Sequence, residues 1–413
     1  MGKFVEVWGK AVFFFVCLAI ALLGVGRIEI PTLGVSFSSW SVSRTVFFFW
    51  LIWKLLVWVV NGEVIFERWK TVFPLSLIFF FVLVTASLLR GFSQWSDYRY
   101  FVFAFFHYIM VADLFFLWNR RQLLLCLLGI APGFLLLRGI FADPSVLSLK
   151  AMVRFGYPLD HPNTAGTLLS MSLPLAVAVW LSYRGWVRRL AFLSSISQFA
   201  GLILTFSRAA WAGGLIALLV ISLKERRLRN GALLLGLLGL VVLLFIGPLR
   251  SRVFSFANAL DDPDVVWRFQ VASYAFAIGT ENPLLGVGYG RDGLRAALQR
   301  SYPVFYKQRY VHHSHNVYAE LAAGVGFLGL STFLWLLGST VFQLLKKAKG
   351  ESITGNRPLV YCLLASVFAF AVTGLGDVPF YHHETRIYFF SLLALCHLCL
   401  KEKADTVSPP NQI

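Results

Sequence analysis

The chain has 413 residues, of which 58% are hydrophobic and only 14% are charged. Soluble domains are about 45–50% apolar and about 25% charged, so this composition excludes an ordinary soluble domain and indicates a polytopic membrane protein. The formal net charge of +17 would suit nucleic-acid binding, but the basic residues cluster in short runs between apolar segments. Runs of that kind set the orientation of a membrane protein, so we expect no nucleic-acid partner.

A helix that spans a bilayer needs about 20 mostly apolar residues, and the chain offers about twelve such segments. They lie near residues 10–26, 41–60, 72–90, 99–118, 122–141, 164–183, 189–206, 208–223, 230–247, 316–345, 357–375 and 386–400. We therefore predict an all-α membrane protein, with spans one to nine in residues 1–247 and spans ten to twelve in residues 316–400. No strand-like alternation is evident, so we expect no β-structure.

The loops between these segments predict which side of the membrane each end occupies. If the N-terminus is cytoplasmic, every cytoplasmic segment carries Lys or Arg, and the short outer loops carry fewer of them. Cytoplasmic loops of membrane proteins are the more basic ones. We therefore expect both termini in the cytoplasm, including a short polar tail at residues 401–413.

One outer loop, residues 248–315, is much longer than the others. Its apolar residues recur on one helical face, at Trp267, Val271, Tyr274 and Ile278. This spacing predicts an amphipathic helix that lies at the outer membrane surface. Asp262 before Pro263 is typical of an N-cap followed by proline at the first helical position, and Gly279 predicts the end of the helix.

The long outer loop also carries more basic than acidic residues. An anionic ligand at the outer surface would explain the excess, although long loops also cross membranes regardless of their charge. Residues 283–291 form a glycine-rich turn that is not a dinucleotide fingerprint, because no βαβ unit surrounds it. Its backbone N–H groups could still bind an anion.

Three histidines, His312, His313 and His315, lie directly before the predicted tenth span, and Asn316 follows them. We expect His315 to begin a helix, whose positive end would keep its imidazole neutral and able to accept a proton. The alternative is that these histidines only cap the helix at the membrane surface. Three glycines follow, at Gly324, Gly326 and Gly329, and indicate close packing between helices.

Other polar residues of the outer side extend this group. Arg208 opens a predicted span, where it either reaches toward the membrane surface or binds phosphate oxygens. His161, Asn163 and Asp377 lie in other outer loops. With His315 these residues could bind a metal ion, but no acidic pair and no His-x-x-x-His spacing accompanies them, so we predict no metal.

These motifs, in this order, resemble those of bacterial O-antigen ligases. They are His315-Asn316 followed by Gly326-x-x-Gly329, Ser207-Arg208 at a helix start, Arg268 on the amphipathic helix, the turn at 283–291, and His161-Pro162-Asn163. The single large outer loop between spans nine and ten fits the same family.

The resemblance implies a membrane glycosyltransferase of the GT-C type in the bacterial inner membrane, acting in lipopolysaccharide biosynthesis. It would transfer O-polysaccharide from undecaprenyl diphosphate to a sugar hydroxyl of the lipid A-core at the periplasmic face, without metal or other cofactor. Membrane lipids would surround the helices and the undecaprenyl tail.

The roles that follow from this resemblance can be assigned residue by residue. His315 would be the general base, Arg208 and Arg291 would bind the diphosphate, and Arg268 would assist. The supporting residues would be Asn316, His312, His313, His161, Asn163 and Asp377. Arginines can neutralise a diphosphate leaving group, and a displacement of this kind would invert the anomeric centre.

Two other functions remain as alternatives. An O-antigen polymerase would use a lipid-linked acceptor, and the motifs do not separate it from a ligase. A lipid-linked sugar flippase or other transporter would also have many helices. Charges within the predicted spans are few, chiefly Lys54 and Asp113, and the polar motifs gather on one face, whereas alternating access needs a site near the membrane midplane.

Overall fold

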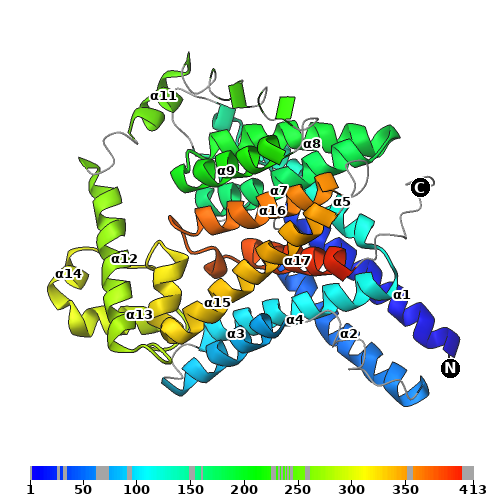
Figure 1. Ribbon diagram of the computed structural model, residues 1–413, viewed down its shortest axis with the longest axis horizontal. Coiled ribbons are helices and arrows are strands. Elements are labelled where there is room, and N and C mark those ends of the chain that lie inside the picture. Colours follow the sequence, from blue (N-terminus) through cyan, green and yellow to red (C-terminus); the bar gives the residue numbers. More distant parts are fainter. Residues whose placement is uncertain are drawn as a thin grey trace.

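The structure is a computed structural model, and its described residues are 2–25, 28–30, 35–61, 74–90, 95–147, 154–159, 161–224, 245–255, 261–350 and 357–401, with single positions between 229 and 241. These residues form an almost entirely helical protein (Figure 1). A long apolar chain favours this architecture, because helices satisfy their own backbone hydrogen bonds where water is excluded.

The α-helices that the structure describes with complete bounds are α1 (Gly2–Ala21), α2 (Ser39–Asn61), α3 (Leu75–Ala86), α4 (Trp95–Leu117), α5 (Arg121–Ile130), α6 (Phe134–Ala142), α7 (Pro162–Ser182), α8 (Gly185–Leu204), α9 (Arg208–Lys224), α11 (Gly247–Phe254), α12 (Pro263–Glu281), α13 (Arg291–Ser301), α14 (Pro303–Gln308), α15 (Val317–Gly350), α16 (Arg357–Thr373) and α17 (His383–Lys401). Short 3₁₀ turns occur at Leu22–Gly24, Ser87–Arg90, Ala131–Gly133, Pro144–Leu147 and Pro379–Tyr381.

Ten of the twelve predicted spans correspond to apolar helices of the described chain, whereas the twelfth, 386–400, lies in α17, which is not among them. In the described part of the chain, 7 helical segments are long and apolar enough to cross a membrane, and three shorter apolar helices accompany them, at Leu75–Arg90, Arg208–Ser222 and Arg357–Thr373. The prediction of a polytopic, helical membrane protein is therefore confirmed. Half of the predicted ninth span, 230–247, lies outside the described residues.

The expectation of no β-structure is wrong at one place. Strand β1 (Ile28–Ile30) pairs antiparallel with β2 (Val35–Phe37), and Ile28 lies opposite Phe37. Strands of three residues are too short to produce a detectable alternation of apolar and polar positions, which is why the sequence pattern did not reveal them.

Two helices form the centre of the bundle. Helix α7 is buried from Asn163 to Val179 and packs against α5, α8, α9 and α16. In α17, every residue from Thr385 to Cys399 is buried. The outward faces of α1, α2 and α3 instead expose large apolar side chains such as Phe14, Phe48 and Phe79, as expected of helices whose surroundings are lipid.

The two charges predicted within spans are paired with one another. Lys54 of α2 and Asp113 of α4 form an ion pair with 2.7 Å between Nζ and Oδ2, and the indole of Trp50 donates to the same carboxylate at 3.1 Å. Charged residues inside a membrane are stabilised by such partners. The ion pair therefore stabilises the contact between α2 and α4.

Helices α12, α13 and α14 lie together at one side of the bundle (Figure 1). They share a small apolar core, made by Val271, Ala275, Ile278, Leu294, Leu298 and Phe305. As predicted, Asp262 caps α12 by accepting from the backbone N–H of Asp264 at 3.0 Å, and Pro263 is the first helical residue.

The predicted end of α12 at Gly279 is two residues too early. The helix continues to Glu281, and a Cβ at Gly279 would lie 2.8 Å from the carbonyl oxygen of Ala322 on α15. Glycine is therefore required at position 279 because α12 and α15 approach each other closely there, and not because α12 ends there.

Helix α15 is broken at Gly326, which has a φ of +74°. The glycine-rich turn packs into this break: Val287 N donates to Ala323 O at 2.8 Å, and Gly288 N donates to Gly324 O at 2.9 Å. These N–H groups are thus used within the protein and cannot bind an anion. The glycines of α15 accommodate a turn, which corrects the expectation that Gly324 and Gly326 serve contacts between helices.

Candidate active site

The loop that carries the histidines ends in a well-defined cap. Asn316 Oδ1 accepts from the backbone N–H groups of Tyr318 and Ala319, each at 3.0 Å, so α15 begins at Val317 rather than at His315. His315 lies just before the cap with a φ of +55°, a left-handed conformation that is uncommon for a residue other than glycine. Such a backbone conformation persists only where the surrounding structure enforces it.

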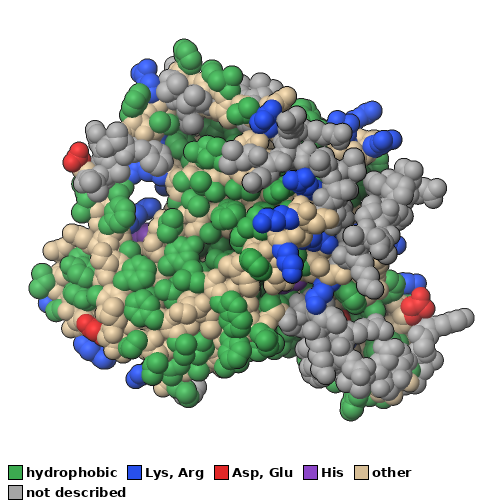
Figure 2. All heavy atoms as spheres, in the orientation of Figure 1, with side chains coloured by type: hydrophobic (Ala, Val, Ile, Leu, Met, Phe, Trp, Pro, Cys, Tyr) green, Lys and Arg blue, Asp and Glu red, His purple; other side chains and the backbone are tan. Residues whose placement is uncertain are grey.

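His315 lines a cavity of about 360 Å³ between the start of α9, α12 and the end of α16. Figure 2 shows an opening in this part of the surface, with basic side chains and a histidine at its rim. The polar residues that line the cavity are Arg154, Asn163, Ser207, Arg208, Arg252, Asp262, Asp264, Arg268, His315 and Asn316. The structure thus brings Arg208 and Arg268 together with His315, as the sequence predicted.

Two of these arginines, Arg154 and Arg252, were not among the predicted site residues. Arg154 donates from Nε to Thr205 O at 3.0 Å and from Nη2 to Asn163 Oδ1 at 2.9 Å. Arg252 donates from Nε to Phe206 O at 3.3 Å. Both side chains therefore bind the backbone of the turn between α8 and α9. In the sequence, the only sign of their role was the excess of positive charge in the outer loops.

The four guanidinium groups repel one another. Burial, followed by the charges of Arg252 and Arg268, lowers the pKa of Arg154 to about 10. Burial, followed by the charge of Arg208, lowers the pKa of Arg252. Both groups stay charged at neutral pH. Asp262 and Asp264 also line the cavity, but the four arginines outnumber them. The net positive charge therefore favours an anionic ligand, which would relieve the repulsion.

The arginines differ in how far they are already neutralised. Arg208 forms an ion pair with Asp262, with 2.8 Å between Nη2 and Oδ2, and also donates to Ser255 Oγ. Arg268 has no hydrogen bond or ion pair to any residue that the structure describes, although it lines the same cavity. Its guanidinium is therefore the one best placed to bind an anion without losing a partner.

His315 is neutral at physiological pH. Burial, followed by the charge of Arg268, lowers its pKa from 6.5 to about 4, while Asp377 acts in the opposite direction. The imidazole is thus neutral, as expected, but the causes are burial and the charge of Arg268 rather than the end of a helix. A neutral imidazole can accept a proton.

His313, His315 and Asp377 form a compact group, in which one ligand atom from each lies within 4.8 Å of the others. His315 Nδ1 and Asp377 Oδ2 are buried and make no hydrogen bond to the described residues. Two imidazoles and a carboxylate are a plausible donor set for a divalent cation. The guanidiniums of Arg154 and Arg268 act electrostatically on this group and oppose a cation there.

The remaining predicted residues differ in how they relate to the cavity. His161 Nδ1 accepts from Asn163 N at 3.1 Å and caps α7, which places Asn163 against Arg154. His312 is exposed and contacts Tyr310 edge to face, with 4.7 Å between ring centroids. Asn163 therefore lines the cavity and His161 positions it, whereas neither His161 nor His312 is among the lining residues.

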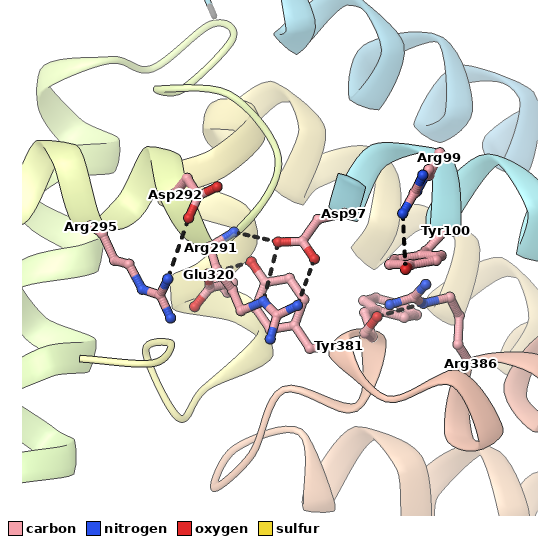
Figure 3. Close-up of polar contacts among 10 residues, drawn as sticks. Asp97, Arg99, Tyr100, Arg291, Asp292, Arg295, Glu320, Tyr381 and Arg386 are labelled. Atoms are coloured by element: carbon pink, nitrogen blue, oxygen red, sulfur yellow. Dashed lines mark hydrogen bonds and ion pairs between the residues drawn. The ribbon is translucent and has the colours of Figure 1, made fainter. Parts of the chain in front are cut away.

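Arg291 does not converge on this cavity, contrary to expectation. Its guanidinium binds Asp97 of α4 through Nε at 3.2 Å and Nη2 at 2.9 Å, as Figure 3 shows. Hydrogen bonds to Asp97 raise the pKa of Arg291. The sequence could not reveal this pairing, because the two residues are 194 positions apart.

Comparison with known protein families agrees with this arrangement. Residues 190–334 match the family model described as O-antigen ligase. The match over this part of the chain supports a place for the protein in the O-antigen ligase/polymerase superfamily. The match includes α8, α9, α12 and the start of α15, and so contains Arg208, Arg252, Arg268 and His315. Members of this superfamily are membrane enzymes of the glycosyltransferase kind that act on lipid-linked glycans. No curated protein matches the chain.

Proposed function

We propose that this protein is an O-antigen ligase that transfers O-polysaccharide from undecaprenyl diphosphate to a sugar hydroxyl of the lipid A-core. One observation carries the proposal: four arginines and a neutral His315 line the same cavity. The arginines supply charge for a diphosphate leaving group, and the histidine supplies a base for the attacking hydroxyl.

The leaving group is bound by guanidinium groups. Arg268 binds the diphosphate first, because no residue of the described structure neutralises it. Arg208 then exchanges its contact with Asp262 for phosphate oxygens, since both ligands fit the same planar fork. Arg154 and Arg252 add positive charge and hold the α8–α9 turn in place.

The transfer is a single displacement. The acceptor oxygen forms a bond to the anomeric carbon, the bond from that carbon to the diphosphate oxygen breaks, and the hydroxyl proton passes to His315. The configuration at the anomeric carbon inverts. Asp377, whose Oδ2 is buried beside the imidazole, stabilises the imidazolium that forms, as a carboxylate partner does in other acid–base pairs.

Donor binding also adjusts the base. Without donor, the charge of Arg268 helps to lower the pKa of His315 to about 4, at which an imidazole is a weak base. A bound diphosphate offsets that charge, so the pKa rises toward the ordinary value and proton acceptance becomes easier. His315 is thus a stronger base when the donor is bound than when it is absent.

The apolar part of the same cavity suits a polyprenyl chain. Ala209, Ala212, Phe269 and Leu375 line it, and Phe269 and Leu375 are 62% and 60% exposed. Small side chains leave room for a lipid tail, and exposed apolar side chains at the opening favour entry from the membrane.

The protein is proposed to lie in the bacterial inner membrane, with both termini cytoplasmic and the cavity facing the periplasm. Helices α9 and α15 both begin at the cavity and run away from it, and α15 ends in Lys346, Lys347 and Lys349. Basic residues favour the cytoplasmic side. We propose no metal or other cofactor, so turnover by purified enzyme should persist in excess EDTA.

The lipopolysaccharide pattern of a deletion strain tests the function and separates it from its nearest alternative. A ligase predicts that all polymer disappears from the lipid A-core while lipid-linked polymer accumulates. A core that carries one repeat unit would indicate an O-antigen polymerase. An unchanged pattern would contradict both. Complementation with wild-type and His315→Ala proteins controls for secondary effects of the deletion.

A further inference from the structure

The loop that carries His315 is held by a carboxylate from the next helix. Glu320 Oε2 accepts from the backbone N–H of Ser314 at 2.7 Å, and Ser314 Oγ donates to Asn316 O at 2.7 Å. Ser314 and Glu320 are both buried. A buried carboxylate must keep its hydrogen-bond donors, so Glu320 fixes the residue directly before His315.

The second oxygen of Glu320 connects this loop to the rest of the molecule. Glu320 Oε1 accepts from the hydroxyl of Tyr381 at 2.6 Å. The guanidinium of Arg291 lies over the ring of Tyr381, with Cζ 5.2 Å from the ring centroid. Figure 3 shows Glu320, Tyr381, Arg291 and Asp97 side by side, although they come from four separate segments of the chain.

Arg291 is in turn fixed by Asp97. Besides the two bonds from its side chain, its backbone N–H donates to Asp97 Oδ2 at 2.8 Å. A charged, bidentate pair of this kind has a well-defined geometry. A diphosphate could bind Arg291 only by displacing Asp97, whereas Arg268 has no such competitor in the described structure.

We propose that Asp97, Arg291, Tyr381 and Glu320 form a positioning network that holds His315 in its reactive orientation. This inference rests on the proposed function of His315 as the base. The network joins α4, the start of α13, the Pro379–Tyr381 turn and α15. It maintains the left-handed backbone of His315 (φ +55°), a strained conformation that persists only where the surroundings enforce it. None of the four residues lines the cavity.

The test measures single-turnover transfer by purified full-length protein while the donor concentration varies. Glu320→Ala should slow transfer at saturating donor by about tenfold to a hundredfold, because a base misplaced by about 1 Å costs about 10² in rate. The half-saturating donor concentration should change by less than about twofold, since no donor contact is lost. Glu320→Gln keeps an acceptor for Ser314 N–H and should recover part of the rate.

Arg291→Lys separates positioning from donor binding. We expect it to lower the saturated rate and to leave the half-saturating donor concentration unchanged, as Glu320→Ala does. Arg268→Lys should instead raise the half-saturating donor concentration. Arg300→Lys, an exposed substitution on the same helix as Arg291, should match the wild type in both quantities.

Coupling to the base provides a second measurement. The double variant His315→Ala/Glu320→Ala should be no slower than His315→Ala alone, because the position of an absent base has no effect. If Glu320→Ala lowers the melting temperature markedly, Tyr381→Phe takes its place in the same comparison, since it removes one hydroxyl only.

Two results would overturn the positioning network. One is a wild-type rate in Tyr381→Phe and in both Glu320 variants. The other is an Arg291→Lys variant that raises the half-saturating donor concentration as much as Arg268→Lys, which would return Arg291 to the diphosphate site. A failure of the proposed function is distinguishable from both, because His315→Ala itself would then keep a near-normal rate.

Discussion

At the scale of single residues, the chemistry depends on which arginines are free to bind the donor. Arg268 makes no hydrogen bond or ion pair within the described structure, Arg208 is held by Asp262, and Arg291 is held twice by Asp97. Three residues of one type therefore have different roles, and only their partners distinguish them. The sequence motif shows an arginine at each position but not its partner.

Substitution of Arg268 tests the assignment of the diphosphate site. Arg268→Lys should raise the half-saturating donor concentration by about tenfold or more, because a point charge cannot replace a bidentate fork on phosphate, and charged hydrogen bonds contribute about 1.5–3 kcal/mol. Arg250→Lys is the control, because Arg250 is exposed on α11 and does not line the cavity. Equal effects of the two substitutions on donor use would place the diphosphate elsewhere.

The pH dependence should report the change in His315 on donor binding. The base must be neutral to act, so activity is lost as the pH falls through its pKa. For the free enzyme that pKa is about 4, and kcat/KM for the donor should lose activity only at acidic pH. The profile of kcat should fall at a higher pH, since bound diphosphate raises the pKa of His315. Identical acid limbs in both profiles would show that the donor does not affect the base.

At the scale of secondary-structure elements, the break in α15 places the site. The helix bends at Gly326 to admit the turn at 283–290, and that turn leads directly to Arg291 at the start of α13. The sequence predicted the helices on both sides, because their apolar length is a strong signal. It did not predict the break, because a glycine cluster in a membrane helix also fits close helix packing.

Two glycine substitutions within α15 test this element. Gly326→Ala should lower the melting temperature of the purified protein, because its φ is +74° and a Cβ would lie 2.6 Å from Pro283 O. A loss larger than about 1 kcal/mol is expected for a side chain at an incompatible position. Gly338→Ala in the same helix meets nothing within 4 Å and should be neutral or slightly stabilising. Equal melting temperatures for both variants would remove the special role of Gly326.

At the scale of the whole molecule, the predictions from sequence succeeded where the signal is local. Helix positions and the cap at Asp262 follow from apolar length and turn chemistry. The meeting of Arg208, Arg268 and His315 was instead implied by the resemblance to O-antigen ligases. The contributions of Arg154 and Arg252 could not be predicted, since they depend on the packing of the α8–α9 turn. The pairing of Asp97 with Arg291 likewise depends on the tertiary fold.

The central claim is that His315 is the base and the arginines bind the donor. The most direct measurement therefore compares transfer and donor binding in His315→Ala. We predict that single-turnover transfer falls by about 10²–10⁴, the usual contribution of a general base, while the dissociation constant for the undecaprenyl diphosphate-linked donor stays within about twofold. Transfer by His315→Ala within a few-fold of the wild-type rate, in correctly folded protein, would contradict the proposed mechanism.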